Sequence, residues 1–294
     1  MGVINLRQWK KLALSLMLSV VATGGALTGQ GILQPEHVSA AANAVPAYEV
    51  KFLGNPDTVL NSDGTPRSNV LETLGLASSP QAIRVEYFDT NLLELNNAGW
   101  DVRFRKKADK SDYELTYKKR YPVVNGDIQA ALTLANKEGF DASDDNYEAE
   151  IDWGYSKQTL SFSNTKKVST KTAGAVLPPE QEALELLLDK LPGKLKNWSS
   201  SNWGKQKLTA SRAHGPLTFE RYEGTWNGQE LTLEVWPVRD GAGTGIQNIV
   251  EISFKTASIS TASGVRSELM SLLKAKGWLI PEDGLKTQLI LERY

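Results

Sequence analysis

Residues 87–105 read Tyr-Phe-Asp-Thr-Asn-Leu-Leu-Glu-Leu-Asn-Asn-Ala-Gly-Trp-Asp-Val-Arg-Phe-Arg, and this stretch decides the fold. Thr90 can cap a short helix that runs through Leu95, and Gly99 can end it. From residue 100 onward, apolar side chains alternate with charged ones, which is the period of a strand whose two faces meet different surroundings. The stretch therefore predicts a strand, a short helix and a second strand with its charges on one face.

The same alternation recurs along the chain, and residues two apart in a strand point to the same side. The shared charged faces are Glu49 and Lys51; Arg103, Arg105 and Lys107; Glu114, Lys118 and Arg120; Glu148, Glu150 and Asp152; and Glu251 and Lys255. One interpretation is a sheet with one face in water. The other is a barrel with the charged faces inside, where carboxylates bind a divalent cation and basic groups bind a polyanion such as a triphosphate.

The order of these segments predicts a mainly β (α+β) protein, mostly antiparallel, with peripheral helices and a single domain over residues 45–294. Asn227-Gly228 predicts a hairpin between two strands. We expect a strand at residues 207–212, a loop at residues 161–175 and a short segment ending at Tyr294. His214, beside Gly215-Pro216, is expected to lie in an exposed loop.

Residues 1–44 are typical of a secretory signal peptide, and an uncleaved membrane anchor is the alternative. Arg7, Lys10 and Lys11 precede an apolar run, and residues 38–44 are small enough for cleavage. The sequence therefore predicts a secreted or extracytoplasmic protein with no stable membrane span after cleavage.

The composition of the 294 residues excludes several kinds of site. The chain has no Cys and only two His, which excludes thiol catalysis, disulfides, Cys-ligated zinc or iron–sulfur sites and any multi-histidine metal site. The formal net charge of -1 argues against a nucleic-acid partner. A metal would therefore need mainly oxygen ligands, which suits Mg, Mn or Ca.

The chain resembles the CYTH domains, also called triphosphate tunnel metalloenzymes, over residues 48–294. The family's opening Glu-x-Glu-x-Lys-Phe corresponds to residues 47–52, and its aromatic-Asp-Thr, Ala-Gly and Arg-x-Arg elements correspond to residues 87–105. Further correspondences are Thr116-Tyr117-Lys118, Glu148-Ala149-Glu150, Arg212, Glu234, Val250-Glu251-Ile252-Ser253 and Leu285-Lys286-Thr287. The resemblance implies a closed antiparallel β-barrel, or tunnel, of about eight strands.

The resemblance also implies functions for individual residues. The implied metal ligands are Glu49, Glu148, Glu150, Glu234 and Glu251. The implied catalytic residues are Glu49, Lys51 and Glu251. Substrate binding falls to Lys51, Arg103, Arg105, Lys118, Arg212 and Lys286. Two carboxylates of the family's Glu-x-Glu pairs are missing, since Ala47 and Ser253 stand in their places, so the basic set is more complete than the acidic one.

Two functions follow from this pattern. The first is an exported protein that binds triphosphate, polyphosphate or another small polyanion in a basic tunnel and hydrolyses it with Mg or Mn. The second is a catalytically degenerate binding module with no hydrolase activity. A purely structural β protein with solvated charges is a third reading, and it predicts no polyanion binding.

Overall fold

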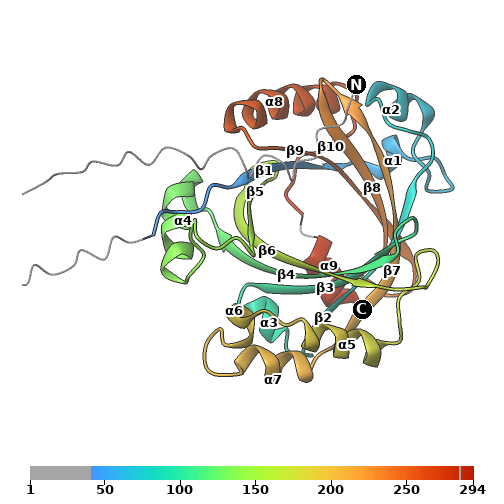
Figure 1. Ribbon diagram of the computed structural model, residues 1–294. Helices are drawn as coiled ribbons and strands as arrows, with labels where there is room; N and C mark the ends of the chain where they lie inside the picture. The colour runs from blue at the N-terminus through green and yellow to red at the C-terminus, as the bar shows by residue number, and fades with distance from the viewer. Residues whose placement is uncertain (1–40, 285) are drawn as a thin grey trace, which may run out of the picture. The chain divides into compact units, whose positions relative to one another are not determined.

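Nine strands close into a barrel in the computed structural model, which describes residues 41–284 and 286–294 (Figure 1). Around the barrel the order is β1-β5-β6-β4-β3-β2-β7-β8-β9, and β9 pairs with β1 to close the ring. The closed barrel predicted from the sequence is confirmed. It has nine strands rather than eight, and it is mixed because β1 and β5 run parallel.

The bounds of the elements are as follows. The strands are β1 (Ala47–Gly54), β2 (Gln81–Asp89), β3 (Trp100–Lys107), β4 (Asp112–Pro122), β5 (Glu148–Trp153), β6 (Gln158–Ser169), β7 (Arg212–Trp226), β8 (Gln229–Arg239), β9 (Ile246–Thr256) and the short β10 (Leu279–Ile280), which pairs with the end of β1. The helices are α1 (Pro56–Val59), α2 (Ser68–Thr73), α3 (Glu94–Asn97), η2 (Val124–Gly126), α4 (Ile128–Lys137), α5 (Glu180–Asp189), α6 (Gly193–Lys196), α7 (Trp203–Thr209), α8 (Ile259–Ala275) and α9 (Lys286–Arg293).

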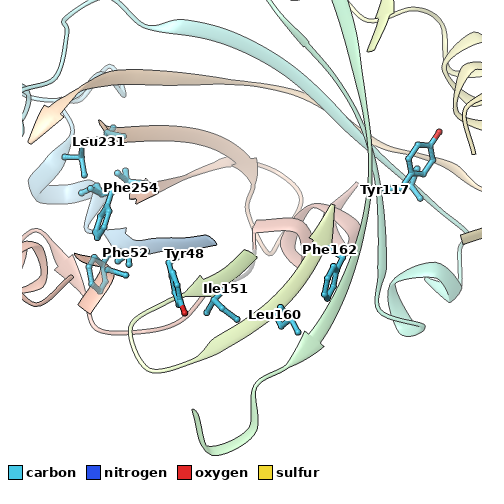
Figure 2. Packing of buried hydrophobic residues seen from close by; sticks show 14 of the residues in the cluster. Tyr48, Phe52, Tyr117, Ile151, Leu160, Phe162, Leu231 and Phe254 are labelled. Carbon is cyan, nitrogen blue, oxygen red and sulfur yellow. The ribbon is translucent and has the colours of Figure 1, made fainter. Parts of the chain in front are cut away.

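The main apolar core lies outside the barrel, between its wall and the surrounding helices. Tyr48, Phe52 and Ile151 belong to this cluster, part of which is drawn in Figure 2. Helix α8 packs on β1 and β9, α4 on β4 and β6, and α3 and α7 on the β2–β3 side. Burying one face of each strand under helices leaves the charged faces on the inside, as the barrel interpretation of the sequence predicted.

One side of the barrel interior is apolar instead, and it holds helix α9. The interior faces of β2, β7 and β8 contribute Ile83, Val85, Leu217, Phe219, Trp236 and Val238. Ile290 and Leu291 of α9 pack against this set, and Figure 1 shows α9 within the ring of strands. The short C-terminal segment expected from the sequence is therefore a helix seated in the barrel.

Three expectations about local structure were wrong. Residues 158–169 form strand β6 because Leu160 and Phe162 face the core while serines take the interior positions, a weaker signal than charge alternation. Residues 203–209 form helix α7, in which Gly204 lies so close to the Leu195 carbonyl that a Cβ would clash. His214 is buried on β7, not exposed in a loop.

The hairpin prediction is confirmed, because Asn227 and Gly228 join β7 to β8 with positive φ angles of 47° and 75°. Residues 1–40 of the predicted signal peptide lie outside the described residues. Asn43, inside the predicted 1–44 boundary, forms an isolated bridge with Asp141. None of the helices in the described ranges is sufficiently long and apolar to traverse a bilayer.

Glu86 is a buried carboxyl on the outer face of β2, and 3% of it is exposed. It lines a pocket of about 350 Å³ together with Arg84 and Glu180, and its Oε1 atom has no hydrogen-bond partner within the described part of the chain. Burial and the negative charge of Glu180 raise the pKa of Glu86 to about 7.

The contribution of Glu86 to stability should therefore fall as the pH rises from about 4.5 to about 7, and Glu86→Gln should remove that contribution. The folded state binds the Glu86 proton more tightly than the unfolded state, so the stabilisation is present below pH 4.5 and is lost as the pH rises through about 7. We expect the variant to recover roughly 1–3 kcal/mol of this pH-dependent loss. Urea unfolding at pH 5 and pH 8 measures it, with the exposed Glu182→Gln as control. Identical pH profiles for Glu86→Gln and the wild type would contradict the assignment.

The apolar contact of α9 predicts a second stability effect. Ile290 is fully buried, so Ile290→Ala should lower the free energy of unfolding by about 2–5 kcal/mol. Gln288, on the exposed side of the same helix, should change it by no more than about 0.5 kcal/mol when replaced by alanine. Urea unfolding followed by tryptophan fluorescence compares them, and equal stabilities would show that α9 is not seated in the barrel.

Candidate polyanion site in the barrel interior

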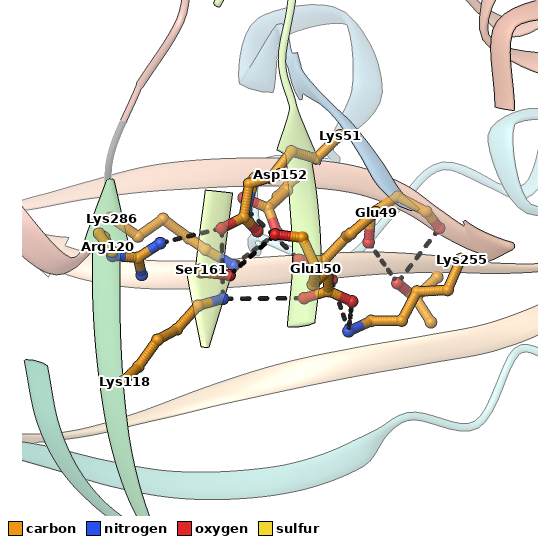
Figure 3. A network of polar contacts seen from close by, with 12 residues as sticks. Glu49, Lys51, Lys118, Arg120, Glu150, Asp152, Ser161, Lys255 and Lys286 are labelled. Atoms are coloured by element: carbon orange, nitrogen blue, oxygen red, sulfur yellow. Dashed lines mark hydrogen bonds and ion pairs between the residues drawn. The ribbon is translucent and has the colours of Figure 1, made fainter. Parts of the chain in front are cut away.

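Asp152 is the centre of an ion-pair network on the interior wall (Figure 3). Its carboxylate accepts from Lys51 Nζ at 2.6 Å and from Arg120 Nη1 at 3.0 Å, and Lys118 Nζ lies at 3.2 Å. Only 4% of the Asp152 side chain is exposed. Burial acts to raise the pKa of Asp152, but the three cations outweigh it and hold that pKa well below its usual range.

Three carboxylates of this network, Glu49, Glu150 and Asp152, place oxygens within 4.8 Å of one another. That spacing is short enough for one metal ion. However, Lys255 Nζ lies 2.6 Å from Glu150 and 3.4 Å from Glu49, so with the three partners of Asp152 four cations surround the three carboxylates. Burial acts to raise the pKa of Glu49, but Lys51 and Lys255 outweigh it and lower that pKa. The charge around the three carboxylates does not fit a divalent cation in this arrangement.

Glu234 and Glu251 form a second acidic pair, and it is bound to Lys286. The Lys286 ammonium donates to Glu234 Oε2 at 2.5 Å and to Glu251 Oε1 at 2.9 Å. Burial acts to raise the pKa of Glu234, but Lys286 and Arg221 outweigh it and lower that pKa. The five predicted metal ligands are therefore not in one place, because Glu234 and Glu251 lie with Lys286 whereas Glu49 and Glu150 lie with Asp152.

A third region, on β3 and β7, has an excess of positive charge. Arg103, Arg105, Lys107 and Arg221 lie here, and Glu114 bonds Arg105 and lies 3.7 Å from Lys107. Within the described ranges Arg103 has no carboxylate within 4.0 Å, and its buried Nε has no hydrogen-bond partner. Burial, followed by the positive charge of Arg103, lowers the pKa of Arg105 to about 10. An anion placed here would relieve this repulsion.

Most of the residues predicted for substrate binding do lie in the interior. Lys51, Lys118 and Lys286 make the ion pairs described above, and Arg103 and Arg105 form the basic region. Arg212 does not reach it: this exposed residue bonds Asn91 and the carbonyl of Tyr294 at the start of β7. Glu148, a predicted metal ligand, is likewise exposed at the start of β5.

The sequence reasoning left several interior residues out of the site, among them Arg120 and Lys107, which it had only grouped with the charged faces. Arg221 occupies the interior position on β7 and donates to Glu234 from Nε at 2.9 Å and from Nη2 at 2.6 Å. Asp152 and Lys255 were grouped with the charged faces but given no part in the site. Their period-2 spacing from Glu150 and Glu251 was the available signal.

No family model and no curated protein matches this chain. Several solved structures are similar in fold. A proposed adenylyl cyclase from Hippeastrum, described as revealing a dominant triphosphatase activity, is 13% identical, with 84% of this chain and 99% of that chain covered and a TM-score of 0.45. A proposed adenylate cyclase from Bacillus halodurans is 16% identical, with 85% and 97% covered and a TM-score of 0.46.

A proposed adenylate cyclase from Vibrio parahaemolyticus is 11% identical, with 83% and 98% covered and a TM-score of 0.42. Because these identities and TM-scores are low, the likeness carries no argument about activity. The function of this chain is therefore argued from its own residues.

Replacing the central carboxylate should be costly. Asp152→Asn removes the carboxylate that Lys51, Lys118 and Arg120 share. Each of these cations keeps one other carboxylate within 4.0 Å, so we expect a loss of about 3 kcal/mol in the free energy of unfolding at pH 7, the low end for breaking a buried ion pair. Because the folded pKa is lowered, this contribution is present above pH 3.8 and is lost as the pH falls through the folded value. Urea unfolding at pH 7 and pH 3 checks this, with the exposed Glu148→Gln as control; equal stability of Asp152→Asn and the control would refute it.

Proposed function

We propose that this chain binds a small polyanion, of the triphosphate or polyphosphate class, inside its barrel. The observation that carries the proposal is the excess of positive charge on β3: Arg105 and Lys107 share one carboxylate, that of Glu114, and Arg103 has none within 4.0 Å in the described part of the chain. Like charges held together in a partly buried place repel one another unless a ligand of opposite sign lies between them. The motif resemblance supports the same class of ligand.

The chemistry of the basic region suits phosphate oxygens. Arginine presents planar donors that match phosphate in a bidentate manner, and lysine adds a compact charge. Arg103, Arg105 and Lys107 are spaced two residues apart on one strand, so their side chains follow a line along the wall. A chain of linked phosphates offers charge along such a line, whereas a single phosphate does not.

Binding without hydrolysis is the function that the carboxylates favour. Phosphoryl transfer needs charge stabilisation at the terminal phosphate, which Mg or Mn commonly supplies. Each acidic group proposed to hold that metal already has a cationic partner, except the exposed Glu148. Burial acts to lower the pKa of Lys51, but Asp152 and Glu49 outweigh it and raise that pKa, so this group stays charged and does not serve as a base.

A metal-dependent phosphohydrolase is the second candidate. The close approach of Glu49, Glu150 and Asp152 favours it, because a bound polyanion could attract their cationic partners and free the carboxylates. We also propose that the protein acts outside the cytoplasm, on the basis of the signal-like residues 1–44.

Tripolyphosphate titrated into the purified full-length chain tests the function. We expect saturable binding by calorimetry and a higher melting temperature, both unchanged by EDTA. Arg105→Gln should weaken binding about tenfold or more, because a charge-assisted contact is lost. Arg212→Gln, which changes an arginine outside the basic region, is the matched control and should bind as the wild type does.

Two results would decide against the proposal. Absence of both binding and stabilisation would remove the polyanion function altogether. Phosphate release that requires Mg or Mn and disappears in Glu150→Gln would instead establish the hydrolase.

A further inference from the structure

We propose that the ammonium group of Lys286 is a built-in cation that holds Glu234 and Glu251 together in place of a divalent metal. Polyanion binding in the barrel is then independent of metal. The second statement rests on the proposed function, whereas the first is a property of the empty protein. The family resemblance implies that a metal ion binds these two carboxylates, whereas here they bind the Lys286 ammonium.

The first argument is that Glu234 has no oxygen free for a metal. Its Oε1 accepts from Nε and Nη2 of Arg221 at 2.9 and 2.6 Å. Its Oε2 accepts from Trp236 Nε1 at 2.8 Å and from Lys286 Nζ at 2.5 Å. Four donors account for the lone pairs that two carboxylate oxygens can offer. A metal could bind Glu234 only by displacing one of them.

The second argument is the charge balance. Glu234 and Glu251 carry two negative charges, and Lys286 and Arg221 carry two positive ones, so this group is neutral. The exposed fraction of the side chain is 7% for Glu234 and 10% for Glu251. It is 14% for Lys286 and 19% for Arg221. At this burial, screening by water is weak, so a divalent ion would add an unbalanced positive charge at high energetic cost.

The third argument is that the fold holds Lys286 in position. It is the first residue of α9, whose Ile290 and Leu291 are buried in the apolar side of the barrel. The Lys286 ammonium also lies 4.2 Å from the centre of the Trp236 ring, in a cation–π contact. A lysine fixed by its own helix and by a ring loses less entropy on forming the two ion pairs than a free surface lysine does.

The Ser253 hydroxyl, which lies on the same wall, also argues against a metal ion here. Ser253 stands where the family has a second carboxylate, and its Oγ lies 2.9 Å from Thr232 Oγ1 in a hydrogen bond. This neutral pair adds no negative charge for a metal. With Ser253 in place of a carboxylate, the two negative charges of this wall are matched by the positive charges of Lys286 and Arg221.

Mn²⁺ binding to the full-length chain, measured by electron paramagnetic resonance and calorimetry, tests the first statement. Glu251→Gln is made both in the wild type and in Lys286→Met. The quantity measured is the Mn²⁺ binding that this substitution removes from each. We expect this binding to be undetectable in the wild type and to appear in Lys286→Met, with affinity raised at least about tenfold by removal of the competing charge. Lys286→Arg should behave as the wild type, and the exposed Lys274→Met is the matched control for loss of one lysine.

Thermal unfolding identifies variants that are folded, and Lys286→Gln replaces Lys286→Met if the latter is not. Glu251-dependent Mn²⁺ binding by the wild type would overturn the proposal. The proposal would also be overturned if no folded variant that lacks the Lys286 charge showed Glu251-dependent Mn²⁺ binding. These readouts do not involve a polyanion, so failure of the proposed function, seen as no tripolyphosphate binding, is distinguishable from failure of this one. Loss of tripolyphosphate binding on adding EDTA would overturn the claim of metal independence alone.

Discussion

Charged groups can be enclosed by a barrel only when each finds an opposite charge, because removing an ion from water costs several kcal/mol. The interior of this protein is arranged around that requirement. Asp152 is shared among three cations, Lys255 joins two glutamates, and Lys286 joins two more. Beside Arg103 the local charge is positive rather than balanced, and the proposed binding of a polyanion rests on this local excess.

The same requirement explains the inverted layering of the molecule. Helices cover the outer faces of the strands, so the apolar residues lie outside the ring and the charged ones within it. The β2–β7–β8 side is the exception, because its interior residues are apolar and α9 covers them. The interior is thus two environments in one barrel, one that holds ions and one that holds a helix, and Lys286 lies where they meet.

Much of this could be predicted from the sequence. Strict alternation marked the strands that carry Glu49, Arg103 and Glu150, since one face of each is buried under helices. Strand β6 was missed because its interior positions are serine and threonine, which do not contrast strongly with its outer residues. Arg212 was assigned to the site because residues 207–212 were expected to form a strand of their own. Residues 203–209 are instead helix α7, Arg212 is the exposed first residue of β7, and the interior arginine of that strand is Arg221.

The acidic site was harder to predict than the basic one for a physical reason. A basic region requires only that several cations lie on the interior face of the barrel. A metal site depends in addition on which carboxylates remain without cationic partners. That depends on contacts between residues far apart in the chain, such as Lys286 with Glu234 and Lys255 with Glu150. Motif matching identified Lys286 as a ligand for substrate but could not show that it is paired to the acids.

The parallel pairing of β1 with β5 has a consequence for how the chain is made. Tyr48 pairs on one side with Ile151 and on the other with Thr256, so the first strand has no neighbour of its own among the residues that follow it directly. A chain that emerges amino-terminus first therefore carries β1 with both edges open until β5 (Glu148–Trp153) is available, and with one edge open until β9 (Ile246–Thr256) follows. The β1–β9 pairing that closes the ring joins strands far apart in the sequence, and such non-local pairings slow folding and leave strand edges open to other chains in the meantime.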